Sequence, residues 1–244
     1  RCLRLPVLRN SAAAIVQDAA LKELGYDEFL LNILRQEYDR LCENSRKNRI
    51  RLAGFPCERY LEDLIVDDLP PDAKQKLPQL KSLEFIKTGR NVILAGNPGT
   101  GKTHLSIGLG IRACCEGYKV LFTTIPLLIT QLKETRSQQL LRAFGNKFAK
   151  YDLVIADELG YISFDKEGSE LLFTHLSLRA GRKSTIITTN LSFDRWSEIF
   201  QDPVMTAAMV DRLTHKSYLI NMNGGSYRLK ETERWIKEGA FDHS

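Results

Sequence analysis

Hydrophobic positions early in the chain recur at intervals of three and four, which is the spacing of one face of an α-helix. The pattern runs through residues 21–41, and Gly25 interrupts it. Because glycine is unfavourable inside a helix, we expect Gly25 to separate two helices. A basic cluster follows, and Gly54 and Pro56 then end the helical pattern. The pattern therefore predicts a small helical N-terminal domain over residues 1–60.

From residue 91 onward, short apolar runs alternate with helical stretches. Strands that are buried on both faces of a parallel sheet have continuous apolar runs of this kind. The expected strands are Val92–Ala95, Val120–Thr123, Leu153–Ala156, Thr185–Thr188 and Tyr218–Asn221. The expected helices are Lys102–Cys115, Leu127–Lys150, Gly168–Ala180 and Ser192–Phe200. The alternation predicts an α/β domain over residues 91–244, in which helices flank a five-stranded parallel sheet.

Two further segments carry turn signals. Residues 61–90 contain Leu69-Pro70-Pro71-Asp72, a cluster that breaks regular structure, so we expect a connector with one short helix near Lys81–Ile86. Beyond the last expected strand, Asn223-Gly224-Gly225-Ser226 predicts the tight turn of a hairpin. A helix over Glu231–Glu238 is expected to follow it.

Composition narrows the class of protein. Of the 244 residues, 43% are hydrophobic and 27% are charged, as in ordinary globular proteins. No run approaches the roughly 18 to 20 apolar residues of a membrane span, so we expect no membrane partner. The five cysteines show no C-x-x-C spacing, which favours reduced thiols in a cytoplasmic protein. The net charge of +5 permits nucleic-acid binding without requiring it.

The strongest chemical signal is Gly96-Asn97-Pro98-Gly99-Thr100-Gly101-Lys102-Thr103, which matches the phosphate-binding pattern G-x-x-x-x-G-K-[ST]. The segment lies between an expected strand and an expected helix, so backbone N–H groups and the helix N-terminus can face phosphate oxygens. Lys102 would place a positive charge at the β- and γ-phosphates of ATP, and the Thr103 hydroxyl would bind Mg²⁺. We expect this loop and the adjacent His104 to contact the nucleotide.

Polar residues end two other expected strands. Asp157 and Glu158 follow one apolar run, and the carboxyl ends of such strands are where ligands bind. Asp157 would hold the magnesium ion, and Glu158 would orient and polarise the attacking water. Asn190 ends the next strand, and its amide could hydrogen-bond that water or the γ-phosphate. The alternative for Asn190 is a cap for the helix that follows.

These motifs resemble those of the AAA+ ATPases. Residues 157–161 (DELGY), 207–213 (AAMVDRL) and 226–229 (SYRL) are more narrowly similar to the ATP-binding transposition regulator IstB, a group related to the DnaC-type helicase loaders. The resemblance extends from about Leu52 to Lys230. It implies an AAA+ P-loop fold and a magnesium-dependent ATP hydrolase, which converts ATP and water to ADP and phosphate. It also implies assembly on duplex DNA and a partner transposase of the same mobile element.

Arginines matter because AAA+ relatives form their nucleotide sites between the subunits of a homo-oligomer. The resemblance places the neighbour's arginine finger at Arg212, and Arg179 and Arg182 are competing candidates. It also brings Arg228 toward the nucleotide, in its own subunit or in the next. Too few residues follow Asn223 for a full C-terminal lid of several helices. A module without a lid fits a nucleotide-controlled switch better than a processive motor.

Two basic clusters are the candidate DNA contacts. The first is Arg46, Lys47, Arg49 and Arg51, and the second is Lys133, Arg136 and Arg142 with Lys147 and Lys150 beyond them. Lysine and arginine contacts to phosphates are salt-dependent and largely independent of sequence, which suits a protein that accepts many target sites. The alternative for each cluster is a solvated helix face.

The resulting hypothesis is an ATPase that oligomerises on duplex DNA and assists a transposase in target selection. A DnaC-type replicative helicase loader is the alternative. A DNA scaffold with negligible hydrolysis is disfavoured because Lys102, Thr103, Asp157 and Glu158 are all present. A small-molecule kinase would need an acceptor site, and no such site is visible in the sequence.

Overall fold

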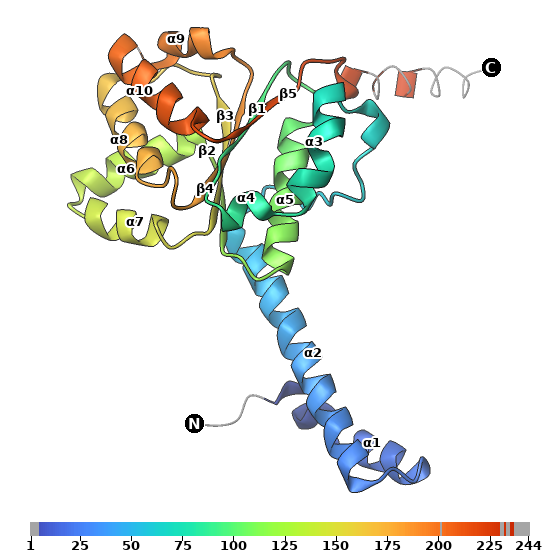
Figure 1. Cartoon of the computed structure of the whole chain (residues 1–244). Coiled ribbons are helices and arrows are strands. Elements are labelled where there is room, and N and C mark those ends of the chain that lie inside the picture. The colour runs from blue at the N-terminus through green and yellow to red at the C-terminus, as the bar shows by residue number, and fades with distance from the viewer. Residues whose placement is uncertain (1–4, 201, 230–231, 233–234, 237–244) are drawn as a thin grey trace.

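The computed structural model describes residues 5–200, 202–229, 232 and 235–236. It has two parts, an α/β body and a helical arm that projects from one side of it (Figure 1). The arm is N-terminal, and the body holds the sheet and all the later elements. No helix among the described residues is long and apolar enough to cross a membrane.

The arm consists of α1 (Pro6–Leu21) and α2 (Tyr26–Ala53), and Gly25 is the N-cap residue of α2. The predicted separation of two helices at Gly25 is therefore confirmed. At 1.5 Å per residue, α2 is about 42 Å long. Its first half pairs with α1, away from the body (Figure 1). Its last turn enters the body, where Ala53 is fully buried and Gly54 ends the helix with a φ of 77°.

Residues 61–90 pack against the sheet and are more ordered than the turn signals predict. They form a 3₁₀ turn, η1 (Val66–Asp68), and two helices, α3 (Pro71–Lys81) and α4 (Glu84–Lys87). The expected breaker at Pro70-Pro71 starts α3, because proline is well suited to the first position of a helix. The predicted break therefore lies between η1 and α3, but helix α3 itself was not predicted, and the expected short helix lies slightly later, at α4.

All five expected strands are present in one parallel sheet of order β2-β3-β4-β1-β5. They are β1 (Val92–Ala95), β2 (Val120–Thr124), β3 (Leu153–Leu159), β4 (Ser184–Thr189) and β5 (Tyr218–Asn221). Strand β3 runs three residues further than the apolar pattern indicates. The expected hairpin after β5 is wrong, since β5 pairs in parallel with β1 and the chain continues through a bend into helical residues 227–229.

Helices cover both faces of the sheet (Figure 1). One face carries α5 (Lys102–Cys115), α3, α4 and the end of α2. The other face carries α6 (Ile125–Ser137), α7 (Leu141–Phe148), α8 (Lys166–Ser177), α9 (Ser197–Phe200) and α10 (Pro203–Thr214), with the 3₁₀ turn η2 (Phe193–Trp196) before α9. The sheet and its helices bury two apolar clusters, one on each face.

Several helices differ from the expectations. The single helix expected over Leu127–Lys150 is two helices, because the chain breaks at Gln139, whose φ is 58°. Helix α10 was not anticipated, although Asp202 caps it by accepting a hydrogen bond from the Met205 N–H. The helix expected over Glu231–Glu238 lies mostly outside the described residues.

Candidate nucleotide-binding site

The phosphate-binding motif connects β1 to α5 at the carboxyl edge of the sheet, beside a cavity of about 380 Å³. Gly99 and Gly101 have φ values of 80° and 88°, which side chains rarely permit, so the loop shape requires glycine there. Gly96 is needed for a different reason. A Cβ atom at Gly96 would lie 2.2 Å from the carbonyl carbon of Met222, which is main chain and cannot turn aside.

Lys102 points into the loop. It is 8% exposed, and its Nζ donates hydrogen bonds of 2.6 Å to the carbonyl oxygens of Gly96 and Asn97. Burial lowers the pKa of the Lys102 ammonium to about 8; the Asp157 carboxylate opposes this shift and the Arg228 guanidinium adds to it. A phosphate in the cavity would replace the two carbonyl oxygens as the partner of a charged lysine.

Thr103, which lines the cavity, contacts the buried Asp157. The Thr103 hydroxyl lies 3.1 and 3.2 Å from the two carboxylate oxygens of Asp157, which is 2% exposed. Burial raises the pKa of this carboxyl group, and hydrogen bonds from Thr188 and Thr103 oppose the rise. A hydroxyl and a carboxylate held together beside a phosphate-binding loop are the oxygen ligands that Mg²⁺ favours. These residues therefore fit a magnesium site.

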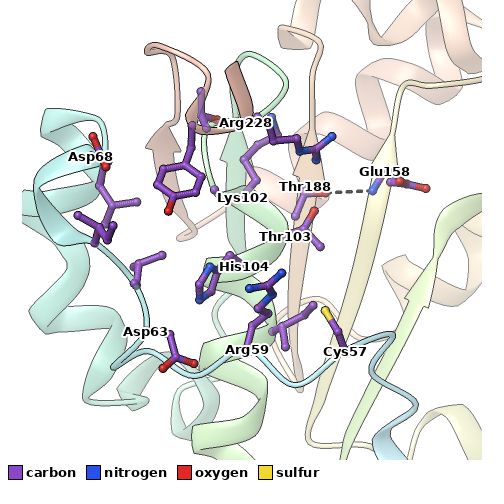
Figure 2. Close-up of a pocket in the computed structure, with 18 of the residues that line it drawn as sticks. Cys57, Arg59, Asp63, Asp68, Lys102, Thr103, His104, Glu158, Thr188 and Arg228 are labelled. Carbon is purple, nitrogen blue, oxygen red and sulfur yellow. Dashed lines mark hydrogen bonds between the residues drawn. The ribbon is translucent and has the colours of Figure 1, made fainter. Parts of the chain in front are cut away.

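Glu158 lines the same cavity and is exposed, whereas Asp157 beside it is buried. Its φ is 68°, an unusual value for a residue with a side chain, and its N–H donates to the Thr188 hydroxyl at 3.0 Å (Figure 2). The site thus has an accessible carboxylate, which lines the cavity, next in sequence to a buried one, which contacts Thr103. An accessible carboxylate next to the phosphates can polarise an attacking water.

Asn190 is not brought to this cavity. Thr188 and Thr189 line it instead, and Asn190 lines a second cavity on the side of β1 and β5. The buried Oδ1 of Asn190 lies close to Gly160, where a Cβ atom would come within 2.7 Å of it. The sequence correctly indicates a strand end with polar groups, but the residue nearest the acids is Thr188.

Three chain segments complete the walls of the cavity (Figure 2). The first is the segment after β5, in which the Tyr227 N–H donates a hydrogen bond of 2.9 Å to the carbonyl oxygen of Gly99. This segment places Arg228 in the cavity wall, beside the phosphate-binding loop of its own chain. His104 also lines the cavity, and its ring Nε2 lies 3.1 Å from the carbonyl oxygen of Tyr60.

The third segment was missed by the sequence analysis. It runs from Cys57 to Leu69 and contributes Arg59, Asp63, Leu64, Ile65 and Asp68. Tyr161, which follows the two acids, also lines the cavity. The only signal was the group of apolar residues before the proline pair. Such a group also fits an ordinary packing segment.

Comparison with known proteins gives the family. A family model described as IstB-like ATP binding protein matches residues 1–234. The chain belongs to this family. It is 35% identical over 232 residues to the ATP-binding protein of insertion sequence IS21 from Pseudomonas aeruginosa, covering 95% of this chain and 88% of that protein. It is 34% identical to the ATP-binding protein of IS5376 from Geobacillus stearothermophilus, covering 94% and 91%.

Solved structures place the fold of this IstB-like chain among AAA+ proteins. AMPPCP-bound DnaA from Aquifex aeolicus superposes with a TM-score of 0.59 at 19% identity, over 76% of this chain and 56% of that one. A DnaI structure superposes with a TM-score of 0.57 at 19% identity, over 72% of this chain and 93% of that one. At this level of identity, the likeness supports the expected AAA+ fold and nothing more about activity.

The candidate arginines differ sharply in surroundings. Arg179 is 2% exposed, and its guanidinium donates to the carbonyl oxygens of Phe148, Tyr151 and Ser184. Because its donors are used inside its own subunit, Arg179 is excluded as an arginine finger. Arg212 lies on the surface of α10 with its guanidinium 5.2 Å from the centre of the Phe173 ring, and it does not line the cavity of its own chain.

The two basic clusters are both present on the surface, but several members have intramolecular partners. On α2, Lys47 pairs with Glu43 at 2.7 Å, Arg51 bonds to Asn48, and Arg49 anchors the helix by donating to the Cys114 carbonyl oxygen at 2.7 Å. Arg46 is exposed on the same helix. The first basic cluster, predicted from the sequence as a DNA contact, therefore includes Arg49, which anchors the helix to the body.

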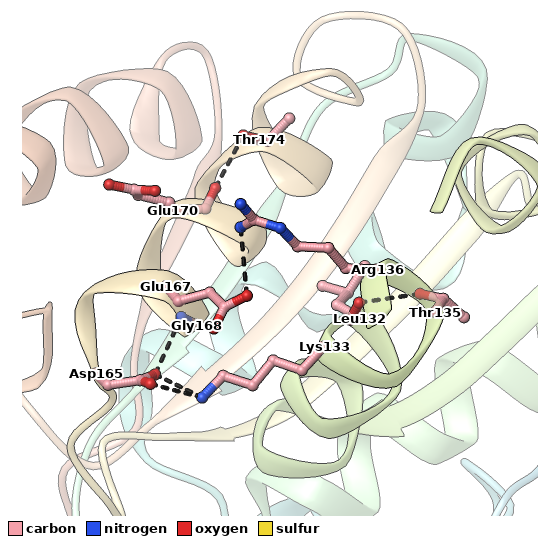
Figure 3. Close-up of polar contacts among 9 residues, drawn as sticks. All are labelled: Leu132, Lys133, Thr135, Arg136, Asp165, Glu167, Gly168, Glu170 and Thr174. Carbon is pink, nitrogen blue, oxygen red and sulfur yellow. Dashed lines mark hydrogen bonds and ion pairs between the residues drawn. The ribbon is translucent and has the colours of Figure 1, made fainter. Parts of the chain in front are cut away.

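In the second cluster, ion pairs tie α6 to the start of α8 (Figure 3). Lys133 pairs with Asp165 at 2.7 Å, and Arg136 pairs with Glu167 at 3.3 Å. Arg142 lies beyond the break, on α7, and is exposed. Because nearby acids neutralise two of its five residues, this cluster is the weaker candidate for DNA.

Proposed function

We propose that this IstB-like protein is a magnesium-dependent ATP hydrolase that oligomerises on duplex DNA and helps the transposase of its mobile element select and use a target. One observation carries the hydrolase assignment. Thr103 and Asp157 meet at 3.1 Å beside the phosphate-binding loop, and Glu158 opens onto the same cavity. The similarity to ATP-binding proteins of insertion sequences supports the transposition role.

The residues of the cavity have distinct roles in this proposal. The loop N–H groups and Lys102 bind the phosphates, while Thr103 and Asp157 would hold Mg²⁺, which would neutralise phosphate charge. Glu158 accepts a hydrogen bond from a water and orients it toward the γ-phosphorus. The water oxygen then bonds to phosphorus, the bond to the β–γ bridging oxygen breaks, and ADP and phosphate result.

Arginines are assigned to two subunits. Arg228 acts in its own chain, since it lines the cavity that its own loop forms. Arg212 does not line that cavity, and in this proposal it acts on the nucleotide of a neighbour. Arginine fingers supplied by a neighbour contribute about 10³ to 10⁵ in rate in related nucleotide hydrolases. Hydrolysis is therefore expected to depend on assembly.

Light scattering on duplex DNA tests assembly directly. Wild type and Glu158→Gln are compared in ATP and in ADP, with Glu170→Gln on the exposed side of α8 as a matched control. Large particles in ATP that persist in Glu158→Gln and dissociate in wild type as ATP is consumed would support the proposal. A protein that stays monomeric on DNA in either nucleotide would refute it.

DNA binding is assigned first to Arg46 and Lys47, because they lie on α2 beside the anchor Arg49 without carrying its hydrogen bond to the body. Replacing both with alanine is expected to weaken binding and reduce the salt slope by about 2, at close to one unit per lost phosphate contact. Lys87→Ala on α4 is the control. An unchanged slope would remove this cluster from the DNA contacts.

A DnaC-type helicase loader is the second candidate. The DnaI structure shares the fold over most of its length, but the two insertion-sequence relatives are much more similar in sequence. Binding to the transposase from the same element, compared with binding to a replicative helicase, separates the two. Association with the helicase alone would favour the loader.

A further inference from the structure

Glu158 lines the cavity, and Asp157 just before it contacts Thr103 and Thr188, which also line the cavity. This is unexpected for neighbours, because successive side chains of a regular strand point to opposite faces. The pairing of β3 with β4 explains how. Ala156 pairs with Ile187 and Leu159 pairs with Thr189, so Asp157 and Glu158 together stand opposite the single residue between those partners. Two residues opposite one is the definition of a β-bulge.

Thr188 is the residue opposite this bulge, and it contacts both acids. Its hydroxyl donates a short hydrogen bond to Oδ1 of Asp157. The same hydroxyl accepts a hydrogen bond of 3.0 Å from the N–H of Glu158 (Figure 2). A hydroxyl has one proton, so accepting from an amide leaves that proton for the carboxylate. Thr188 is 2% exposed, which keeps water from replacing either bond.

The bulge needs such support because Glu158 holds a φ of 68°. Residues other than glycine adopt this region rarely, and they keep it only when their surroundings over-determine it. The Thr188 hydroxyl gives the Glu158 N–H a buried partner in that conformation. The same hydroxyl fixes the rotation of the Asp157 carboxylate, which also faces Thr103.

We propose that Thr188 is a positioning residue for ATP hydrolysis: its hydroxyl couples the carboxylate of Asp157 to the backbone of Glu158 and so aims both acids at the phosphates. This inference rests on the proposed hydrolase activity. It assigns Thr188 a role through the two acids, distinct from any direct contact with nucleotide. Its hydroxyl is the essential feature, and its methyl group is not.

The test is a pair of substitutions at one position. Thr188→Val keeps the shape and removes the hydroxyl, and Thr188→Ser keeps the hydroxyl. Thr185→Val is the matched control, because Thr185 is fully buried on the same strand and its hydroxyl bonds to Arg179 rather than to the acids. All three variants and wild type are first compared for folding by thermal unfolding.

Steady-state hydrolysis on DNA gives the first readout. We expect Thr188→Val to lower kcat by about 100-fold with KM changed less than about threefold, since a misplacement near 1 Å is enough for such a loss. Thr188→Ser should keep kcat within about fivefold of wild type. In a Glu158→Gln background, valine should add little further loss, because both changes remove the same water activation.

Amide hydrogen exchange gives a second readout that needs neither nucleotide nor metal. The Glu158 amide should exchange at least about tenfold faster in Thr188→Val than in wild type, and at the wild-type rate in Thr188→Ser. Normal exchange at Glu158 in Thr188→Val, or a kcat within about threefold of wild type, would overturn the inference. So would a folded serine variant as inactive as valine. Absence of hydrolysis by wild type on DNA would instead refute the proposed function, and the exchange result would still decide the role of Thr188.

Discussion

ATP affinity is expected to fall as pH rises through the pKa of Lys102. The ammonium is buried, and its pKa is lowered from 10.5 to about 8. ATP phosphates favour the charged lysine, so binding should raise this pKa back toward its ordinary value. At pH values between about 8 and 10.5, Lys102 therefore takes up a proton when ATP binds. Raising the pH therefore weakens binding.

The magnitude follows from those two pKa values. If binding restores the value of 10.5, the dissociation constant should rise about tenfold between about pH 7 and about pH 9, or roughly 1.4 kcal/mol. The nucleotide contributes little to this change because the second pKa of a phosphate group is near 6. The expected curve is flat near neutral pH and rises by up to tenfold per pH unit above the pKa.

Fluorescent ATP titrated into Glu158→Gln, the variant chosen to block hydrolysis, measures this dissociation constant. Lys102→Arg should bind with no such pH dependence, because a guanidinium stays protonated throughout the range. Lys102→Ala should bind weakly and equally at all these pH values, which also controls for other groups that line the cavity. A rise of the same size in Lys102→Ala would refute the assignment of the titration to Lys102.

Three further outcomes are expected. Gly96→Ala should destabilise the fold by about 1 to 3 kcal/mol in thermal unfolding, because its Cβ atom collides with the main chain at Met222; an unchanged melting temperature would count against this contact. Arg179→Met should cost about 3 kcal/mol by chemical denaturation, since buried carbonyl oxygens lose their donors, while turnover per folded molecule is kept. Arg212→Ala should be inactive alone and recover hydrolysis when mixed with Lys102→Ala, whose arginine is intact; failure to recover would place Arg212 outside the shared site.

The strand pattern could be predicted because it depends on local sequence. Continuous apolar runs identified β1 and β5 with the bounds that the structure shows, and the other three strands within a few residues. The phosphate-binding loop was equally accessible, since its glycines and lysine are adjacent in sequence and each has a conformational or chemical reason. Gly99 and Gly101 occupy positive φ, as a loop of this kind requires.

Helix boundaries were less predictable where a residue has two possible roles. Proline both ends and starts helices, and Pro71 starts α3, where its missing N–H costs no hydrogen bond within the helix. The break between α6 and α7 falls at Gln139, a residue with no breaking tendency of its own. In both cases the residue type alone does not decide between continuing, ending and starting a helix.

The candidate site shows where local reasoning stops. A pattern that ends in Asp157 and Glu158 predicts carboxylates at a strand end, but in a regular strand only one of the two could face the phosphates. Here Glu158 lines the cavity while Asp157 still contacts Thr103, because β3 gains a residue relative to β4, and that offset exists only in the pairing of strands about thirty residues apart. The same offset brings Thr188, rather than Asn190, to the acids. The chemistry of the site therefore depends on the register between two strands as much as on the identity of the acidic residues.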